Sequence, residues 1–530
     1  MLRRDGADFR WDWLTGQFEC CVLNIYSRAL ATCKQNHFGQ GSRYRVASKL
    51  TFERFLSIQR SDFANRGQTA NRAPFVLMAK PAKWRTYEGQ QYPQTYNWPS
   101  PNLQSAAYQA YNQPHMVDRL VYPRFATNKL AEALSDSPAV LLHGPRQCGK
   151  SWLAQSVGEP LGFTYLTFDD NNLLEAAKAD PQGFVAELPV RTILDEIQHA
   201  PELFRAIKSA IDRDRQPGRF LLTGSANVFL VPALGESLAG RMEIVRLHPL
   251  AQSEIAMKQS NLIETLFNGK VGIKKTERLG SQLADRITVG GYPPAVERKT
   301  ESRRAAWYRD YIETQIRKDV RDLAKISSFE VLPRLLSYAA SQTAHLLNVS
   351  ELAGPFQVSR QTIRDYLTLL ESIFLLDELQ PWHTNRISRM IKTPKLHIND
   401  TGVACSLLGM NPESLYADRT LYGQMLETFV YQELRRESSW HEDEFKFYHY
   451  RTRDQKEVDI VIERGASQLV GIEIKASSTV RTSDFNGLRQ LKNYAGSRFV
   501  KGVVLYDGET SLGFGDEMYA IPIRFMWEGF

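Results

Sequence analysis

Hydrophobic residues after Met116 fall into short runs, separated by stretches with helical spacing. The runs at 139–142, 164–168, 192–194, 220–222 and 244–247 predict strands. The segments between them predict helices, because apolar residues that recur every three or four positions form one face of a helix. Strands that alternate with helices are typical of an α/β fold with a parallel sheet.

The pattern changes twice further along the chain. Residues from about 260 to 328 are mostly helical and charged, interrupted by a Gly- and Pro-rich turn at 290–294. Residues 330–380 are again helical, and short alternating runs return from 385 to 530. These last runs indicate a second α/β region.

Residues 1–115 differ from the rest of the chain. The stretch 86–114 is rich in Gln, Tyr, Asn, Pro and Ser, and Glu88 is its one charged residue. Such a composition buries too little apolar surface to offset the chain entropy lost on folding. We therefore expect a disordered extension, or a mis-assigned start, with the functional chain beginning at Met116.

One group of residues in this extension resembles a metal cluster only superficially. It consists of Cys20, Cys21, Cys33 and His37. Adjacent cysteines are poorly placed to bind one ion, and the usual C-x2-C spacing is absent. We expect no metal site there.

Charge narrows the choice of partners. The 530-residue chain has 66 Lys and Arg against 59 Asp and Glu, and its formal net charge of +7 would favour a nucleic-acid partner. Residues 1–115 hold 15 of the basic and 7 of the acidic residues, which leaves 51 and 52 in 116–530. The part that carries the motifs is therefore nearly neutral, and net charge gives no support for a nucleic-acid partner.

Composition also excludes several classes of protein. No run approaches the ~18 to 20 apolar residues that span a bilayer. The first residues carry charges where a secretory signal would be apolar. Five cysteines are too few, and odd in number, for a disulfide framework. We expect a cytoplasmic protein without a membrane partner.

Residues 144–151 form a candidate phosphate-binding loop between a predicted strand and a predicted helix. They fit the pattern G-x-x-x-x-G-K-[ST], in which backbone N–H groups surround phosphates at a helix N-terminus. Lys150 is expected to reach the β- and γ-phosphates of ATP, and Ser151 to ligate Mg²⁺. The predicted nucleotide-binding residues of the loop are Gly144, Pro145, Arg146, Gln147, Cys148, Gly149, Lys150 and Ser151.

Two further predicted strands end in polar residues. Asp195, after the third strand, is expected to hold Mg²⁺ through its water shell. Glu196 is expected to orient or deprotonate the attacking water. After the fourth strand come Thr223 and Ser225. One of these hydroxyl groups could sense the γ-phosphate; the alternative is that the segment is only a turn.

Arg241 comes just before the fifth predicted strand. An arginine supplied across a subunit interface stabilises transition-state charge in some ATPases. A plain surface arginine is the equal alternative for Arg241.

Four motifs together carry a family resemblance. They are Gly-Pro-Arg-Gln-Cys-Gly-Lys-Ser (144–151), Leu-Asp-Glu-Ile-Gln (194–198), Leu-Leu-Thr-Gly-Ser (221–225) and Leu-Ala-Gly-Arg (238–241). This set resembles a widespread prokaryotic group of AAA-type ATPases that carry a C-terminal domain of uncharacterised function. The similarity runs from about residue 116 to at least residue 496. The familiar loop has Val in place of Cys148, which is a small apolar exchange. Because AAA-type ATPases often form rings, a homo-oligomer is a candidate state.

Residues 348–379 predict a helix, a tight turn, a second helix capped by Ser359 and then a strand. This spacing is typical of a helix-turn-helix with a wing. The second helix would present Arg360, Gln361 and Arg364 outward, where they could contact DNA. Winged helices also serve as lids and as protein-docking modules, so DNA binding and such a docking role remain equal alternatives.

The last region carries a second candidate site. Residues 457–463 and 471–476 alternate strictly, which places Ile472 and Ile474 on one face and Glu473 with Lys475 on the other. Further upstream, Asp400 is expected to be the N-cap of the helix that directly follows it.

Asp459 and Glu473 could share one Mg²⁺, with Lys475 beside them to position or activate water. This D…E-x-K arrangement resembles the restriction-endonuclease-like fold, in which an acid at the position of Glu427, near the start of a helix, completes the metal site. Such folds are often reused as binding modules, so cleavage is an open question.

The leading hypothesis is a Mg²⁺-dependent ATPase whose nucleotide state controls a nuclease-like domain acting on DNA or RNA. The alternatives are a nucleotide-gated regulatory switch without nuclease activity and a DNA-binding transcription factor. The expected organisation is a disordered extension (1–115), an AAA-type P-loop core (116–258), a helical lid or linker (259–330), a winged-helix-like part (331–392) and a restriction-endonuclease-like α/β domain (393–530).

Overall fold

The computed structural model describes most of the chain after residue 120. Described are residues 121–530 apart from 226–237, 239, 324–329, 385–392 and 453, and the side chains of 318–323 are not described either. The expectations for the extension and for Cys20, Cys21, Cys33 and His37 lie outside the described residues. Among the described residues, no helix combines the length and the apolar character needed to cross a membrane.

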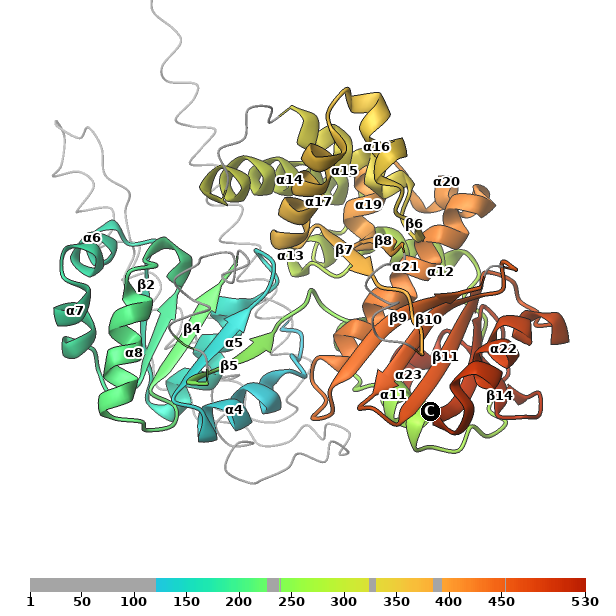
Figure 1. Cartoon of the computed structure of the whole chain (residues 1–530), viewed down its shortest axis with the longest axis horizontal. Coiled ribbons are helices and arrows are strands. Elements are labelled where there is room, and N and C mark those ends of the chain that lie inside the picture. Colours follow the sequence, from blue (N-terminus) through green and yellow to red (C-terminus); the bar gives the residue numbers. More distant parts are fainter. Residues whose placement is uncertain (1–120, 226–237, 239, 324–329, 385–392, 453) are drawn as a thin grey trace, which may run out of the picture. The chain divides into compact units, whose positions relative to one another are not determined.

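A parallel five-stranded sheet forms the first described domain (Figure 1). Its strands are β1 (Ala139–His143), β2 (Thr164–Thr167), β3 (Thr192–Asp195), β4 (Phe220–Gly224) and β5 (Met242–Arg246). Their order is β2-β3-β4-β1-β5, and every neighbouring pair is parallel. The strands predicted from the hydrophobic runs are confirmed. Because all five are parallel, the loop after β1 and the acids after β3 lie at the same edge.

Helices cover both faces of this sheet. They are α4 (Thr127–Asp136), α5 (Lys150–Gly158), α6 (Asn171–Ala179), α7 (Pro181–Glu187) and α8 (Leu203–Arg213). Val140 and Leu142 of β1 pack with α4 and α5, whereas Ala139 and Leu141 pack with α6, α7 and α8. Burial on both faces explains why the central strands β1, β3 and β4 appear in the sequence as continuous apolar runs.

Helices dominate the middle of the chain, as expected. They are α10 (Gln252–Ile255), α11 (Leu262–Phe267), α12 (Ser281–Val289), α13 (Pro293–Val296), α14 (Glu301–Leu323), α15 (Val331–Ser341), α16 (Val349–Phe356) and α17 (Arg360–Ser372). Ser359 is the N-cap of α17 and accepts a hydrogen bond from the Thr362 N–H. The predicted cap is therefore confirmed, and Arg360, Gln361 and Arg364 are exposed.

A small antiparallel sheet accompanies these helices. It consists of β6 (His345–Leu346), β7 (Leu376–Leu379) and β8 (Lys395–Ile398), in the order β6-β8-β7. Strand β8 pairs with both others, although it follows the boundary that we expected between residues 392 and 393. The strand that begins the expected C-terminal domain thus belongs to the small sheet.

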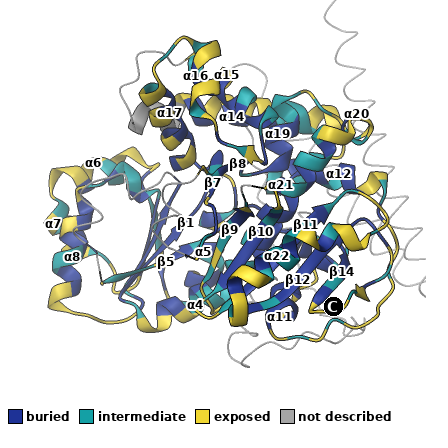
Figure 2. Ribbon diagram, turned by 45° about the vertical axis from the view of Figure 1, so that its right-hand side comes forward, coloured by how far each residue is buried: buried dark blue, intermediate teal, exposed yellow. Residues whose placement is uncertain are grey.

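A mixed six-stranded sheet forms the C-terminal part. The elements are α19 (Thr401–Leu407), α20 (Pro412–Ala417), α21 (Arg419–Ser438), β9 (Phe445–Arg451), β10 (Glu457–Arg464), β11 (Gln468–Lys475), α22 (Asn486–Ala495), β12 (Phe499–Tyr506), β13 (Leu512–Gly513), β14 (Met518–Pro522) and α23 (Phe525–Glu528). The order is β13-β14-β12-β11-β10-β9. Strands β9, β10 and β11 are antiparallel, and β12 runs parallel to β11. The central strands of both large sheets are buried (Figure 2).

Two of our local expectations in this part are wrong. A register shift between Val458 and Val461 interrupts the strict alternation of β10, so that Val458 and Ile460 pack on opposite faces. A β-bulge of this kind re-aims the side chains beside it. In addition, α21 begins at Arg419, which places Glu427 within the helix rather than near its start.

Candidate functional site

The loop between β1 and α5 requires glycine at two positions. Gly149 is the N-cap of α5 and has a φ of +100°, which glycine adopts without strain. A Cβ atom at Gly144 would lie 2.0 Å from the Leu247 carbonyl oxygen, just after β5. Cys148 is buried, and burial raises the pKa of its thiol. Cys148 therefore packs as an apolar residue, consistent with Val in the familiar motif.

The first two residues of α5 point polar atoms back toward the loop and toward β3. The buried Lys150 Nζ donates to the Pro145 carbonyl oxygen at 2.9 Å. The Ser151 hydroxyl donates to Asp195 Oδ1 at 2.9 Å. The loop and the acid after β3, which are 44 residues apart in sequence, thus form one site.

Asp195 accepts hydrogen bonds from two more hydroxyl groups. The Thr223 hydroxyl donates to Asp195 Oδ1 at 2.5 Å, and the Tyr165 hydroxyl donates to Asp195 Oδ2 at 2.7 Å. Burial, together with the Asp195 carboxylate, raises the pKa of Tyr165 to about 12. Tyr165 was missed by our sequence reasoning, because a tyrosine on a partly buried strand carries no motif signal.

Glu196 has an unusual backbone, and its carboxylate accepts two hydrogen bonds through one oxygen, Oε2. Its φ of +55° is rare for a residue other than glycine, and its N–H donates to Thr223 Oγ1 at 3.1 Å. The carboxylate accepts from Ser225 at 3.1 Å and from Gln198. Burial alone would raise the pKa of Glu196, but Lys150 and the Gln198 hydrogen bond bring this pKa below its ordinary value. Glu196 is therefore a charged acceptor at neutral pH.

A cavity of about 300 Å³ opens beside Glu196. Its lining residues come from the loop, from Glu196 itself and from α14, and they are Arg146, Gln147, Glu196, Trp307, Asp310, Tyr311, Thr314 and Gln315. The Tyr311 hydroxyl donates to the Arg146 carbonyl oxygen at 3.5 Å. The ring of Trp307 stacks on that of Tyr311 at 5.1 Å. Helix α14 therefore packs against the outside of the loop.

These groups fit ATP and Mg²⁺. Magnesium prefers oxygen ligands, and the Ser151 hydroxyl and the Asp195 carboxylate are hydrogen-bonded to each other at the end of the loop. The Lys150 ammonium and the N-terminus of α5 provide positive charge for phosphates. These residues would hold a nucleoside triphosphate and its cation at this edge of the sheet.

Arg241 lies at the opposite end of the strands. It comes before β5, and β5 runs parallel to β1, so Arg241 is one strand length from the loop. Its guanidinium forms an ion pair with Asp212 at the end of α8, with Nε 2.6 Å from Oδ1. Contact with a nucleotide would therefore need the loop of a second subunit.

A second cavity, of about 350 Å³, brings together the four residues predicted for a nuclease-like site. Glu427 reaches it from α21, Asp459 from β10, and Glu473 with Lys475 from β11. The Ile474 N–H donates to Asp459 Oδ2 at 2.9 Å. Lys475 Nζ lies 2.7 Å from Glu473 Oε1. The predicted face is confirmed, since Ile474 and Ile472 pack in the apolar core.

An additional ammonium group lies among these carboxylates. Lys395 Nζ of β8 is 2.8 Å from Glu427 Oε1, 2.7 Å from Glu457 Oε1 and 3.5 Å from Asp459 Oδ1. Burial alone would lower the pKa of Lys395, but the three carboxylates raise it above its ordinary value. Lys395 and Glu457 were not expected, because nothing near Lys395 in sequence shows what it will pair with.

The carboxylates of this cavity do not fit a divalent metal in the arrangement described. Within the described part of the chain, no group of three or more His, Cys, Asp or Glu is arranged to hold a metal ion. A cation between Glu427 and Asp459 would meet the Lys395 ammonium, and like charges at such distances repel strongly. Burial raises the pKa of both Glu427 and Glu473 to about 8.

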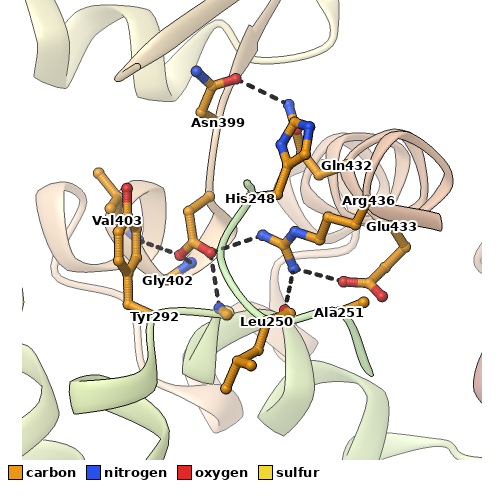
Figure 3. Close-up of polar contacts among 12 residues, drawn as sticks. His248, Leu250, Ala251, Tyr292, Asn399, Gly402, Val403, Gln432, Glu433 and Arg436 are labelled. Carbon is orange, nitrogen blue, oxygen red and sulfur yellow. Dashed lines mark hydrogen bonds and ion pairs between the residues drawn. The ribbon is translucent and has the colours of Figure 1, made fainter. Parts of the chain in front are cut away.

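A buried polar cluster joins the end of the ATPase domain to α21 (Figure 3). The Arg436 guanidinium donates to the Leu250 carbonyl oxygen at 3.0 Å, to Asp400 at 3.0 Å and to Glu433 at 2.6 Å. Asp400 also accepts from the Gly402 N–H at 2.9 Å. Its predicted role as the N-cap of α19 is thereby confirmed, and the same carboxylate helps to hold α21 in place.

Comparison with protein families identifies three matched regions. An AAA domain matches residues 136–256. Two domains of unknown function follow, DUF8612 at residues 280–414 and DUF4143 at residues 422–526. The AAA domain spans the parallel sheet and the loop, so the expectation of an AAA-type ATPase is confirmed.

Solved structures resemble parts of the chain only distantly. The Walker-type ATPase PABY2304 of Pyrococcus abyssi is 14% identical, with a TM-score of 0.31 over 54% of this chain and 96% of its own. The RuvB Holliday junction branch migration motor of Thermotoga maritima is 16% identical, with a TM-score of 0.24 over 48% of this chain and 89% of its own.

Two mycobacterial proteins are much closer to the chain. They are the uncharacterised proteins Mb2031c of Mycobacterium bovis and Rv2008c of Mycobacterium tuberculosis. Each is 30% identical over 429 residues, which cover 80% of this chain and 89% of the relative. The chain belongs to the family of these two proteins, and it carries an AAA-type ATPase domain followed by two domains of unknown function.

Proposed function

We propose that the protein binds ATP with Mg²⁺ and hydrolyses it at the carboxyl edge of the five-stranded sheet. The observation that carries this proposal is the convergence of the loop with two acids. Ser151 is hydrogen-bonded to Asp195, and the Lys150 ammonium acts electrostatically on Glu196. Hydrolysis of ATP depends mostly on positioning and on stabilising charge, and these residues supply both.

Each residue then has one task. The loop backbone and Lys150 hold the β- and γ-phosphates, and Ser151 and Asp195 hold the cation, which when bound neutralises phosphate charge. Glu196 orients the attacking water and accepts its proton. In this proposal Thr223 contacts the γ-phosphate, and its hydrogen bonds to Asp195 and to the Glu196 N–H support that role.

Replacement of Lys150 tests this proposal. Lys150→Ala should weaken ATP binding at least tenfold and abolish turnover, because it removes a charge-assisted contact worth about 1.5 to 3 kcal/mol. Lys178→Ala on α6, which removes an exposed lysine, is the matched control. Both ATP affinity and phosphate release should be measured with the full chain. Unchanged turnover in Lys150→Ala would refute the assignment.

We also propose that the nucleotide state controls the rest of the chain. Support comes from Phe374, in the loop between α17 and β7. Its ring lies 4.8 Å from that of His143 at the end of β1, and 5.5 Å from the Arg246 guanidinium at the end of β5. Gln315 of α14, which lines the cavity beside Glu196, donates to the Ile373 carbonyl oxygen at 3.2 Å. A change at the loop can therefore be passed to the small sheet.

For the C-terminal part, we propose a winged-helix-like unit built from α15, α16, α17 and the small sheet, followed by a restriction-endonuclease-like domain. The order of helices and strands in the small unit supports the first assignment. Glu427, Asp459, Glu473 and Lys475 around one cavity support the second. DNA or RNA is the substrate class that this proposal implies.

Nucleic-acid cleavage is tested directly. Plasmid, linear and single-stranded DNA and RNA are incubated with the protein, ATP and Mg²⁺ or Mn²⁺. Cleavage should disappear in Asp459→Ala and in Lys475→Ala. Cleavage that survives both substitutions would place the activity elsewhere.

A second candidate function is a nucleotide-gated switch whose C-terminal domain binds a partner without cutting. The position of the Lys395 ammonium among the carboxylates favours it. In this case the incubations above should leave every substrate intact while ATP turnover persists.

A further inference from the structure

The cation in the second cavity comes from a different element than the acids that surround it. Lys395 belongs to β8 of the small sheet. The acids belong to the C-terminal part, with Glu427 on α21, Glu457 and Asp459 on β10, and Glu473 on β11. One unit of the fold therefore inserts a positive charge into an acidic pocket of another.

The geometry at Lys395 is that of a fully engaged cation. Its side chain is 3% exposed, and all three carboxylate contacts lie within 3.5 Å. The Lys395 backbone is fixed as well, since β8 pairs with β7 through Leu379 and with β6 through Leu346. A buried ammonium that loses its carboxylates would be strongly destabilised, as would the carboxylates without it.

The remaining acid lacks a full set of partners. Glu473 Oε2 is buried and makes no hydrogen bond among the described residues. Glu473 Oε1 is engaged by Lys475 at 2.7 Å. One buried carboxylate oxygen of the pocket is thus left without a hydrogen-bond partner among the described residues.

We propose that Lys395 is an internal cation that takes the place of a divalent metal in this pocket and keeps such metals out while β8 is in place. The proposal rests on the proposed function only in treating the pocket as the D…E-x-K site. It requires neither ATP hydrolysis nor cleavage of nucleic acid. Lys395 lies in the small sheet, whereas Asp459 and Glu473 lie in the six-stranded sheet, so the internal cation and these acids belong to different sheets.

Direct binding of Mn²⁺, followed by electron paramagnetic resonance without nucleotide, tests this proposal. All proteins carry Asp195→Asn, which removes the carboxylate proposed to hold the cation at the nucleotide edge. With Lys395 in place we expect no Mn²⁺ bound in the pocket. Lys395→Met should bind one Mn²⁺ at least about tenfold more tightly than the protein that retains Lys395, because the repulsion between the ammonium and the metal ion is removed. A further Asp459→Asn substitution should abolish that binding.

Two results would overturn the proposal. One is Mn²⁺ binding with Lys395 present that is lost on Asp459→Asn, because the pocket would then accept a metal beside the lysine. The other is a Lys395→Met protein that gains no Mn²⁺ site. Neither result depends on turnover, so loss of this inference is distinguishable from loss of the ATPase or nuclease proposal.

Lys395→Met leaves several acids without a counter-charge and can therefore fold poorly. For that reason the thermal unfolding of this variant is also measured, with and without Mn²⁺. Mn²⁺ should raise the melting temperature of Lys395→Met and restore its refolding. The matched variant Lys395→Arg keeps the charge and should not respond to Mn²⁺. An equal effect of Mn²⁺ on the two variants, or no stabilisation of Lys395→Met by Mn²⁺, would contradict the proposal that Lys395 excludes metals.

Discussion

At the scale of single residues, His143 shows how the nucleotide edge controls charge. It ends β1, lies against Phe374 and is 6% exposed. Burial, together with Arg246 and Lys150, lowers the pKa of His143 to about 3. The folded protein therefore keeps this side chain uncharged next to a loop that must attract phosphate by other means.

This low pKa makes stability depend on pH. The unfolded chain takes up a proton on His143 near pH 6.5, whereas the folded protein does so near pH 3, so stability is lost as pH falls below 6.5. Between pH 7 and pH 5, wild type should lose about 2 kcal/mol more than His143→Phe, a variant that keeps an aromatic ring against Phe374. Urea unfolding at both pH values measures this difference. An identical loss in the two proteins would show that the fold leaves the pKa of His143 near 6.5.

At the scale of elements, the cluster in Figure 3 depends on how α12 ends. Gly290 is the C-cap of α12, with φ 67° and ψ −158°. A Cβ there would lie 2.2 Å from Asp400 Oδ1 and 2.4 Å from the Tyr308 hydroxyl. Gly291 N–H donates to Asp400 Oδ2 at 2.8 Å. The close approach of this turn to α19 therefore excludes a side chain.

Gly290→Ala should destabilise the protein more than a matched substitution elsewhere. Gly496 ends α22 in a similar backbone conformation, with φ 60° and ψ −133°, but a Cβ there would meet nothing within 4 Å. Both substitutions add backbone strain. Gly290→Ala also displaces Asp400 and should cost about 2 kcal/mol more in the free energy of unfolding. Equal losses would mean that the Asp400 contacts contribute little.

Much of this element structure could be predicted from sequence, and the exceptions have physical causes. The central parallel strands β1, β3 and β4 are buried on both faces, so their apolar runs are unambiguous. The caps at Ser359 and Asp400 are local signals. The bulge after Val458 left no such signal. The contacts of Lys395 and Tyr165 join residues far apart in the chain, and one sequence does not show such pairings.

At the scale of the whole molecule, the ATPase domain has its candidate arginine at the edge away from its own loop. The loop and Glu196 lie at the carboxyl edge, and Arg241 lies at the amino edge beside Asp212. We propose a homo-oligomer in which Arg241 of one subunit reaches the nucleotide of the next.

Mixing experiments test this assembly. Arg241→Ala and Lys150→Ala should each abolish turnover alone. A mixture of the two should regain activity, because some interfaces then combine an intact loop with an intact arginine. Asp212→Asn leaves the arginine in place and is expected to keep most activity. Full turnover by Arg241→Ala would assign Arg241 to the surface.

The central claim is that Glu196 activates the water that hydrolyses ATP at the carboxyl edge of the five-stranded sheet. Its most direct test compares ATP affinity and phosphate release in wild type and Glu196→Gln, with the exposed Glu175→Gln as control. The account predicts that Glu196→Gln binds ATP about as tightly as wild type but turns over at least about 100-fold more slowly. Turnover by Glu196→Gln at the wild-type rate would contradict it.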